Sequence, residues 1–278
     1  MVSVQTEREA MIEILTGDFR ELSKNIESDS IDLVCTDPPY PREFLPLWAD
    51  LGRVAARVLK PSGFLVSYSG NMFLPEVMGM LGEHLSYYWL GGLYHRGPKS
   101  RIWARNILQA MKPILVYQKP PYKIQSYRFI DLVESPKQDK RHHKWGQPVI
   151  PTRRLVEAFS NESDLIFDPF LGGGTTAVAC RQTGRNCIAH EIDPEVAERA
   201  RKRVATCQMP LIKPETIQYD FETMDTPRCK SCSAILETNG GPGRKKEYCD
   251  DACRQAAYRN RKQRNVTKLR PSATGASV

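Results

Sequence analysis

Apolar positions along this chain follow two patterns, short continuous runs and stretches with helical spacing. Runs such as Ile31–Thr36 and Phe64–Tyr68 are typical of strands buried on both faces of a parallel sheet. Between them, residues 41–60 carry apolar side chains every three or four positions, which predicts an amphipathic helix. The same patterns predict strands over residues 85–93, 113–118, 164–167 and 186–189, and helices over residues 74–84, 152–160, 175–182 and 194–205. Strands that alternate with helices predict an α/β fold with a doubly wound, mostly parallel sheet.

Residues 94–147 interrupt this alternation. Apart from the strand predicted at 113–118, basic and aromatic residues interleave there on loop-like sequence, as in His95–Arg101 and Lys137–Trp145. Such a composition suits contacts to phosphates and exposed bases, and it equally suits a solvated loop that frames a pocket. Residues 206–228 contain several prolines and are predicted to be a linker.

A tetrapeptide, Asp37-Pro38-Pro39-Tyr40, follows the first buried strand. An exocyclic amine on a flat ring is a poor nucleophile because its lone pair is delocalised into the ring. The Asp37 carboxylate and the Pro38 carbonyl can each accept one N–H of such an amine, which localises the lone pair. The Pro38-Pro39 pair holds that carbonyl still, and Tyr40 can stack on the ring. A turn of this kind also occurs for purely structural reasons, so the tetrapeptide alone leaves both interpretations open.

A glycine-rich turn, Asp168–Thr176, follows a later strand and opens a helix. Gly172 and Gly174 allow close approach of the backbone to a ligand, and the helix N-terminus offers N–H groups to an anion. Glu191 ends the next strand, where its carboxylate can accept hydrogen bonds from both hydroxyls of a ribose. The turn lacks the lysine of a phosphate-binding P-loop. Together these features indicate a site for a nucleoside-containing cofactor.

The two motifs together resemble those of the DNA amino-methyltransferases, which transfer a methyl group from S-adenosylmethionine to adenine N6 or cytosine N4. The tetrapeptide precedes the glycine-rich turn, which is the order in the permuted β group of that family. The resemblance covers roughly residues 12–205 and rests on the segments Gly17-Asp18, Ile31–Tyr40, Leu59–Gly63, Trp145–Pro148, Asp168–Thr176 and Gly184–Asp193. It implies a Rossmann-like methyltransferase sheet, with S-adenosylmethionine as cofactor and DNA as substrate.

The resemblance also implies roles for individual residues. The catalytic set, which would hold the flipped target base, is Asp37, Pro38, Pro39 and Tyr40. The cofactor-binding set is Asp18, Asp168, Phe170, Gly172, Gly174, Thr175 and Glu191. In this family the Asp form of the tetrapeptide is mostly found with adenine and the Ser form with cytosine, so we expect adenine N6 as the target. Residues 94–147 occupy the place of the target-recognition region. This chain departs from the family in having Gly173 where Ser is common and His190 where Gly is common.

The excess positive charge lies near the C-terminus. The chain has 40 basic and 32 acidic side chains, and residues 227–278 hold 12 and 4 of them, so this segment accounts for the whole net charge of +8. Such an asymmetry indicates a polyanionic partner, most simply nucleic acid, with a solvated basic tail as the alternative.

Four cysteines in this tail, Cys229, Cys232, Cys249 and Cys253, have the spacing of a zinc site with four thiolate ligands. Metal binding would supply the folding free energy of so small a module, on the order of 10 kcal/mol. Four thiolates leave no open coordination position, so we expect a structural zinc ion. The other four cysteines, Cys35, Cys180, Cys187 and Cys207, are predicted to be free thiols in a reducing compartment.

We therefore expect a methyltransferase domain over residues 1–222 and a basic, zinc-binding tail over 223–278. No apolar stretch approaches the roughly 20 residues of a membrane span, and the polar N-terminus does not predict a signal peptide. The expected location is the cytoplasm of a bacterial, phage-infected or archaeal cell. Methylation of cytosine N4 or of RNA, and a non-catalytic nucleic-acid-binding protein, are the alternatives. The recognition sequence, a homodimeric state and a partner nuclease stay open.

Overall fold

The computed structural model describes residues 10–95, 99–124, 129–135 and 148–208, and in the tail residues 229, 247–248, 251–255 and 258. The chain divides into two compact units, Met1–Lys213 and Pro214–Val278. The predicted domain boundary at 222/223 and most of the predicted linker lie outside the described residues. In the part of the chain that is described, no helix is long and apolar enough to cross a membrane.

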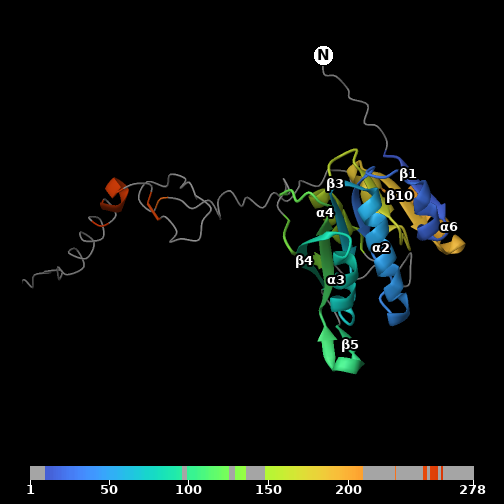
Figure 1. Cartoon of the computed structure of the whole chain (residues 1–278), viewed down its shortest axis with the longest axis horizontal. Coiled ribbons are helices and arrows are strands. Elements are labelled where there is room, and N and C mark those ends of the chain that lie inside the picture. Colours follow the sequence, from blue (N-terminus) through green and yellow to red (C-terminus); the bar gives the residue numbers. More distant parts are fainter. Residues whose placement is uncertain are drawn as a thin grey trace, which may run out of the picture. The chain divides into compact units, whose positions relative to one another are not determined.

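The described part of the first unit is built around a central sheet with helices packed on it (Figure 1). The strand order of this sheet is β1-β10-β9-β2-β3-β7-β4-β8. Its strands are β1 (Ile12–Thr16), β2 (Ile31–Thr36), β3 (Leu59–Tyr68), β4 (Ser86–His95), β7 (Met111–Gln118), β8 (Leu132–Ser135), β9 (Leu165–Asp168) and β10 (Asn186–Glu191). Neighbouring strands from β1 through to β3 are parallel, as are β4 and β8, whereas β7 is antiparallel to both β3 and β4. The prediction of a mostly parallel α/β sheet is confirmed.

Helices cover both faces of this sheet, and each face has its own hydrophobic core. The helices are α1 (Phe19–Leu22), α2 (Leu45–Val58), α3 (Leu74–Gly82), α4 (Val149–Phe159), α5 (Thr175–Thr183) and α6 (Pro194–Ala205). Val34 on β2 is buried in one core with Trp48 of α2, and the adjacent Leu33 is buried in the other core with Leu155 of α4. Successive side chains of a strand point to opposite faces, so both cores are built on the strand that leads into Asp37.

Several elements differ from those expected from the sequence. The loop-like expectation for residues 94–147 is wrong over much of the described part, because β5 (Ser100–Ile102) and β6 (Ile107–Gln109) form a hairpin and β8 adds an edge strand. The left-handed backbone of Asn106, with φ 51°, ends the turn of that hairpin. The strand predicted to begin at Phe64 begins at Leu59, because a register shift between β2 and β3 accommodates the intervening Pro and Gly. β1 and α1 were not predicted.

Candidate functional site

The predicted site residues gather at the carboxyl ends of four neighbouring parallel strands. In sheet order these ends carry Asp18 after β1, Glu191 in β10, Asp168 in β9 and Asp37 after β2. The crossover from β9 runs through α5 on one face, and the crossover from β2 runs through α2 on the other. Ligands of open α/β sheets bind at such a switch point, outside the carboxyl ends of the strands. The sheet therefore brings the two sequence motifs to the place where a ligand is expected.

A buried hydrogen bond joins the two motifs. Thr36 Oγ1 donates to Asp168 Oδ1 over 2.6 Å, although the two residues are 132 positions apart in sequence. The backbone N–H of Phe170 donates to the same oxygen over 3.0 Å. Asp168 is 2% exposed, and this burial raises the pKa of its carboxyl to about 6. Asp168 thus lies beneath the glycine-rich turn and holds it against the end of β2.

The glycine-rich turn requires glycine at two positions. Gly172 and Gly174 have φ values of +52° and +83°, in the left-handed region that L side chains rarely adopt. A Cβ on Gly174 would lie 3.2 Å from the Cβ of Ala200, whereas a Cβ on Gly172 would meet no described atom within 4 Å. The backbone at Gly172 is therefore open to an approaching ligand.

Glu191 is fixed in orientation beside this turn. Its Oε2 accepts the N–H of Gly172 over 2.8 Å, and its Oε1 accepts the N–H of Asp193 over 2.9 Å. A carboxylate has about four lone-pair sites, so each oxygen retains capacity for a hydroxyl donor. Gly174 is the N-cap residue of α5 and provides no side-chain cap for the first turn of this helix. An open turn, an N-terminus of this kind and an oriented carboxylate fit a nucleoside-containing cofactor.

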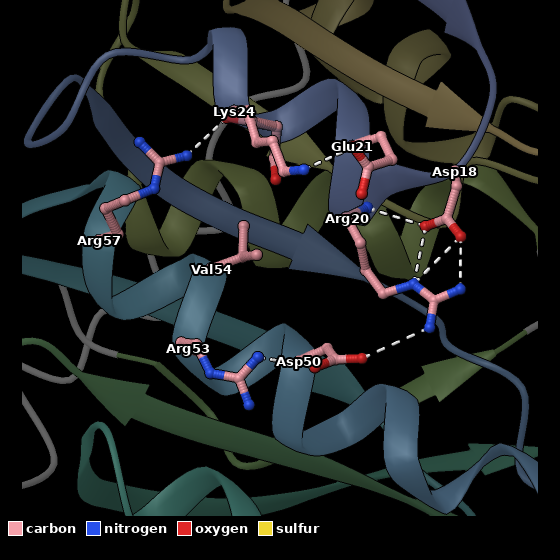
Figure 2. Close-up of a pocket in the computed structure, with 9 residues that line it drawn as sticks. Asp18, Arg20, Glu21, Lys24, Asp50, Arg53, Val54 and Arg57 are labelled. Atoms are coloured by element: carbon pink, nitrogen blue, oxygen red, sulfur yellow. Dashed lines mark hydrogen bonds and ion pairs between the residues drawn. The ribbon is translucent and has the colours of Figure 1, made fainter.

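Asp18 lies at the rim of a surface hollow of about 570 Å³ between α1 and α2 (Figure 2). It caps α1 by accepting the N–H of Arg20 and forms a 2.5 Å ion pair with the Arg20 guanidinium, which lies 3.6 Å from Asp50. This guanidinium lowers the pKa of the Asp18 carboxyl. Asp18 faces Arg20 in this structure, and its contact with a cofactor stays a prediction.

Lys112, at the start of β7, is a site residue that the sequence patterns missed. Its Nζ lies 2.8 and 3.0 Å from the two carboxylate oxygens of Asp37. The ammonium also lies 4.8 and 4.7 Å from the ring centroids of Tyr40 and Tyr68, within cation–π range. Burial lowers the pKa of Lys112, and the Asp37 carboxylate opposes that shift. In the sequence, Lys112 could have been noticed as a single charged residue directly before the apolar run of the strand predicted at 113–118.

Tyr40 packs closely against Asp37 and Gly70. Its hydroxyl donates a hydrogen bond to Asp37 Oδ1, and burial raises the pKa of the phenol, so the hydroxyl stays a donor. A Cβ on Gly70 would come within 3.0 Å of the Tyr40 Cβ, so the glycine allows the close approach. Pro38 is buried and Pro39 is half-buried. The tetrapeptide is thus a packed unit whose carboxylate already has oriented donors.

The predicted zinc ligands cannot be assembled from the described residues. Cys229 and Cys253 are described, whereas Cys232 and Cys249 lie outside the described residues. No group of three or more His, Cys, Asp or Glu side chains suited to a metal occurs in the described ranges. The zinc site stays a prediction. In the first unit, Cys35, Cys180 and Cys187 are buried free thiols and Cys207 is a half-buried one, as expected.

The sequence of this chain is similar to those of known DNA methyltransferases. A sequence family described as DNA methylase, of the N6/N4 type, matches residues 130–202. The type II methyltransferase M.HpaI of Haemophilus parainfluenzae is 25% identical over 223 residues, which cover 65% of this chain and 70% of the relative. These findings support a DNA amino-methyltransferase.

Solved structures of other proteins share the fold. The complex of M1.HpyAVI with SAM has a TM-score of 0.58 and 24% identity, and the match covers 69% of this chain and 100% of that one. The PvuII DNA methyltransferase, described as cytosine-N4-specific, has a TM-score of 0.62 and 16% identity, and the match covers 74% of this chain and 90% of that one. At these identities the likeness shows the α/β methyltransferase fold and leaves the target base open.

Proposed function

We propose that this protein transfers a methyl group from S-adenosylmethionine to an exocyclic amino group in DNA, with adenine N6 as its target. The observation that carries the proposal is the adjacency of the two motifs at neighbouring strand ends, joined by the Thr36–Asp168 hydrogen bond. One motif is built to hold an amine and the other to hold a nucleoside cofactor. A methyl transfer between them requires this proximity.

S-adenosylmethionine would lie against the turn that follows β9. The cofactor would contact the open backbone at Gly172 and the adjacent Gly174 and Thr175. The Glu191 carboxylate would accept hydrogen bonds from the hydroxyls of its ribose. Phe170, whose ring packs 4.8 Å from that of Phe19, offers an apolar surface nearby. M1.HpyAVI, which has the same fold, was solved with SAM. When bound, the cofactor supplies an electrophilic methyl group.

The residues after β2 would prepare the amine. The Asp37 carboxylate and the Pro38 carbonyl accept its two N–H groups, which localises the nitrogen lone pair. Lys112 and Tyr40 donate hydrogen bonds to the Asp37 carboxylate and fix its orientation. As the nitrogen gains positive charge during transfer, the fixed carboxylate stabilises that charge. The target base would first leave the duplex, at a cost of a few kcal/mol.

Product analysis tests this function and its alternatives. The full chain is incubated with S-adenosylmethionine and either duplex DNA or structured RNA, and the digested nucleosides are identified by mass spectrometry. We expect N6-methyladenine from DNA, and none from the variant Asp37→Ala, which should still bind cofactor. N4-methylcytosine would replace the adenine assignment, and methylated RNA alone would replace the DNA assignment. Absence of any methylated product would favour a non-catalytic nucleic-acid-binding protein.

We also propose that residues 223–278 form a DNA-binding tail around a structural zinc ion, separate from a catalytic domain over residues 1–222. The supporting observations are the spacing of Cys229, Cys232, Cys249 and Cys253 and the net charge of the tail. Metal analysis of the purified full chain should give about one zinc per chain, and Cys232→Ser should lose it. Deletion of residues 227–278 should weaken DNA binding and flatten its salt dependence while cofactor binding survives. An unchanged salt slope would contradict the role of the tail.

A further inference from the structure

The glycine-rich turn between β9 and α5 contains three consecutive glycines, Gly172, Gly173 and Gly174. Glycine loses more conformational freedom on ordering than any other residue, so such a run does not hold one conformation by itself. The N–H of Gly172 donates to Glu191 Oε2, and the N–H of Gly174 donates to the carbonyl of Leu171 over 3.1 Å. These two bonds fix the ends of the run and leave its central residue to another contact.

Arg203, in the last turn of α6, holds the central glycine. Its guanidinium donates to the carbonyl of Gly173 over 2.6 Å, and the same nitrogen donates to Thr175 Oγ1 over 3.3 Å. Hydrogen bonds from a charged donor are shorter and stronger than those between neutral groups. Arg203 therefore fixes the peptide group that joins Gly173 to Gly174.

The helix that carries Arg203 is itself fixed beside the turn. Glu191 Oε1 accepts the N–H of Asp193, and the Asp193 side chain caps the N-terminus of α6. A Cβ on Gly174 would lie 3.2 Å from the Cβ of Ala200, which is three positions before Arg203 and therefore on the same face of the helix. The position of the guanidinium is thus set by a helix that packs directly against the turn.

One peptide group of the turn has no protein partner. Within the described ranges, neither the N–H of Gly173 nor the carbonyl of Gly172 takes part in a hydrogen bond. The peptide groups on either side of it are both bonded, and a Cβ on Gly172 would meet no described atom within 4 Å. The peptide group between Gly172 and Gly173 can therefore bind a ligand, and its direction depends on the fixed groups beside it.

We propose that Arg203 is a positioning residue for the cofactor, because it holds the Gly173 carbonyl and so sets the direction of the peptide group between Gly172 and Gly173. This inference rests on the proposed function. With Arg203 in place, the free protein already has the turn in its binding conformation. Without it, the cofactor has to order three glycines on binding, which lowers its affinity. Arg203 acts through the turn, so its removal weakens binding and leaves the transfer step unchanged.

Cofactor binding to the full chain tests the role of Arg203. Arg203→Met keeps an apolar stem and removes the donors of the side chain. It should weaken S-adenosylmethionine binding about tenfold in calorimetric titration, as expected for the loss of a charge-assisted hydrogen bond. In methylation assays KM for S-adenosylmethionine should rise by the same factor while kcat at saturation stays within about twofold. Arg203→Lys keeps a charged donor and should recover part of the affinity.

Amide hydrogen exchange separates positioning of the turn from a general loss of stability. Without cofactor, the amides of Gly172 and Gly174 should exchange about tenfold faster in Arg203→Met than in the wild type, because the turn opens more often. With saturating cofactor the exchange rates of the two proteins should agree, because the bound cofactor itself orders the turn. Equal exchange rates in the two cofactor-free proteins would contradict the proposal.

Arg57 provides the matched control. It is half-buried like Arg203 and also donates to backbone carbonyls, those of Ser23 over 2.5 Å and Ile26 over 2.7 Å. It lies in the last turn of α2, which leads into the start of β3, at the edge of the sheet opposite the glycine-rich turn. Arg57→Met should lower the free energy of unfolding and keep the wild-type cofactor affinity. Equal losses of affinity in Arg57→Met and Arg203→Met would overturn the proposal.

The failure of this role and the failure of the proposed function give different results. If the wild type methylates DNA and Arg203→Met binds cofactor like the wild type, the role of Arg203 is wrong and the function stands. If the wild type binds S-adenosylmethionine but methylates no DNA, while Arg203→Met binds it more weakly, the function is wrong and the role of Arg203 stands. If the wild type does not bind S-adenosylmethionine, both are wrong.

Discussion

Lys112 Nζ lies 2.8 Å from one carboxylate oxygen of Asp37 and 3.0 Å from the other, across 75 positions of sequence. The lysine side chain is 8% exposed and the aspartate 30%, so the pair is partly removed from water. Breaking a buried pair by removing one partner is costly, because the remaining charge loses its compensation. The catalytic carboxylate of the proposed reaction therefore depends on a residue from a different part of the chain.

Replacement of Lys112 by Met should slow methyl transfer at neutral pH by tenfold or more, equivalent to about 1.4 kcal/mol or more. The Lys112 ammonium holds the Asp37 carboxylate in place to accept the amine, and its removal leaves that carboxylate without its charged donor. Lys112→Arg keeps a cation at this position and should retain more activity. Single-turnover rates of both variants and of the wild type check both expectations.

An exposed lysine pair provides the control for this variant. Lys60 lies 2.6 Å from Asp32, but its side chain is 46% exposed, and such pairs contribute about 1 kcal/mol or less. Lys60→Met should keep the wild-type rate. Identical rates for Lys112→Met and the wild type would show that the pair only stabilises the fold.

Alanine substitutions at Gly172 and Gly174 should change cofactor affinity and the free energy of unfolding to different extents. Both have positive φ, so alanine costs about 1–2 kcal/mol at either position. Gly174→Ala also clashes with Ala200 and should destabilise more, whereas the new methyl of Gly172→Ala enters the open space before the turn. We expect Gly172→Ala to lose S-adenosylmethionine affinity by tenfold or more with the smaller drop in unfolding free energy. Calorimetric titration and urea unfolding give the two quantities.

Gly79 of α3 is the matched control for these variants. Its φ is not positive and a Cβ there meets no described atom within 4 Å. Gly79→Ala should stabilise the helix by up to about 1 kcal/mol and leave cofactor affinity unchanged. A loss of affinity in this variant would mean that the effect at Gly172 is not local.

The motif strands and their turns could be predicted because local sequence determines them. An apolar run that ends in Asp37-Pro38 must leave the sheet there, and the glycines of the second turn permit a backbone that other residues resist. The Lys112–Asp37 pair could not be predicted, because it depends on β7 lying two strands from β2 in antiparallel orientation. The β5–β6 hairpin was missed because its exposed Trp, Ile and Leu side chains lack the alternation of a strand with one buried face.

Asp168→Asn should change the pH dependence of stability. The pKa of this carboxyl is raised to about 6 in the fold, mainly by burial, from an ordinary value of 3.8. The folded state holds the proton that the unfolded state releases, so the contribution of Asp168 to stability is present below pH 4 and is lost as pH rises through 6. The loss is up to about 3 kcal/mol. The amide oxygen of the asparagine can still accept the hydrogen bond from Thr36. The variant should therefore gain stability relative to the wild type between pH 4 and pH 7. Urea unfolding at these two pH values measures the gain.

His190 should make stability depend on pH in the opposite direction, and the variant His190→Leu should remove that dependence. The imidazole is fully buried against Phe167, and neither of its nitrogens has a hydrogen-bond partner among the described residues. Burial lowers its pKa to about 4, so the folded state resists the proton that the unfolded state binds near pH 6.5. The contribution of His190 is therefore present above pH 6.5 and lost as pH falls towards 4, by up to about 3 kcal/mol. The leucine variant should also be more stable at neutral pH, because it removes unsatisfied polar atoms.

These two trends overlap between pH 4 and 6 and partly cancel in the wild type, so each single variant should expose the other residue. Asp168→Asn should lose stability steeply on acidification because His190 remains, and His190→Leu should lose stability on alkalisation because Asp168 remains. The double variant should be nearly flat over this range. Urea unfolding of all four proteins at half-unit pH steps gives the comparison. Parallel pH profiles for the four would contradict the burial of both groups, since the slopes depend on pKa values that only the folded interior changes.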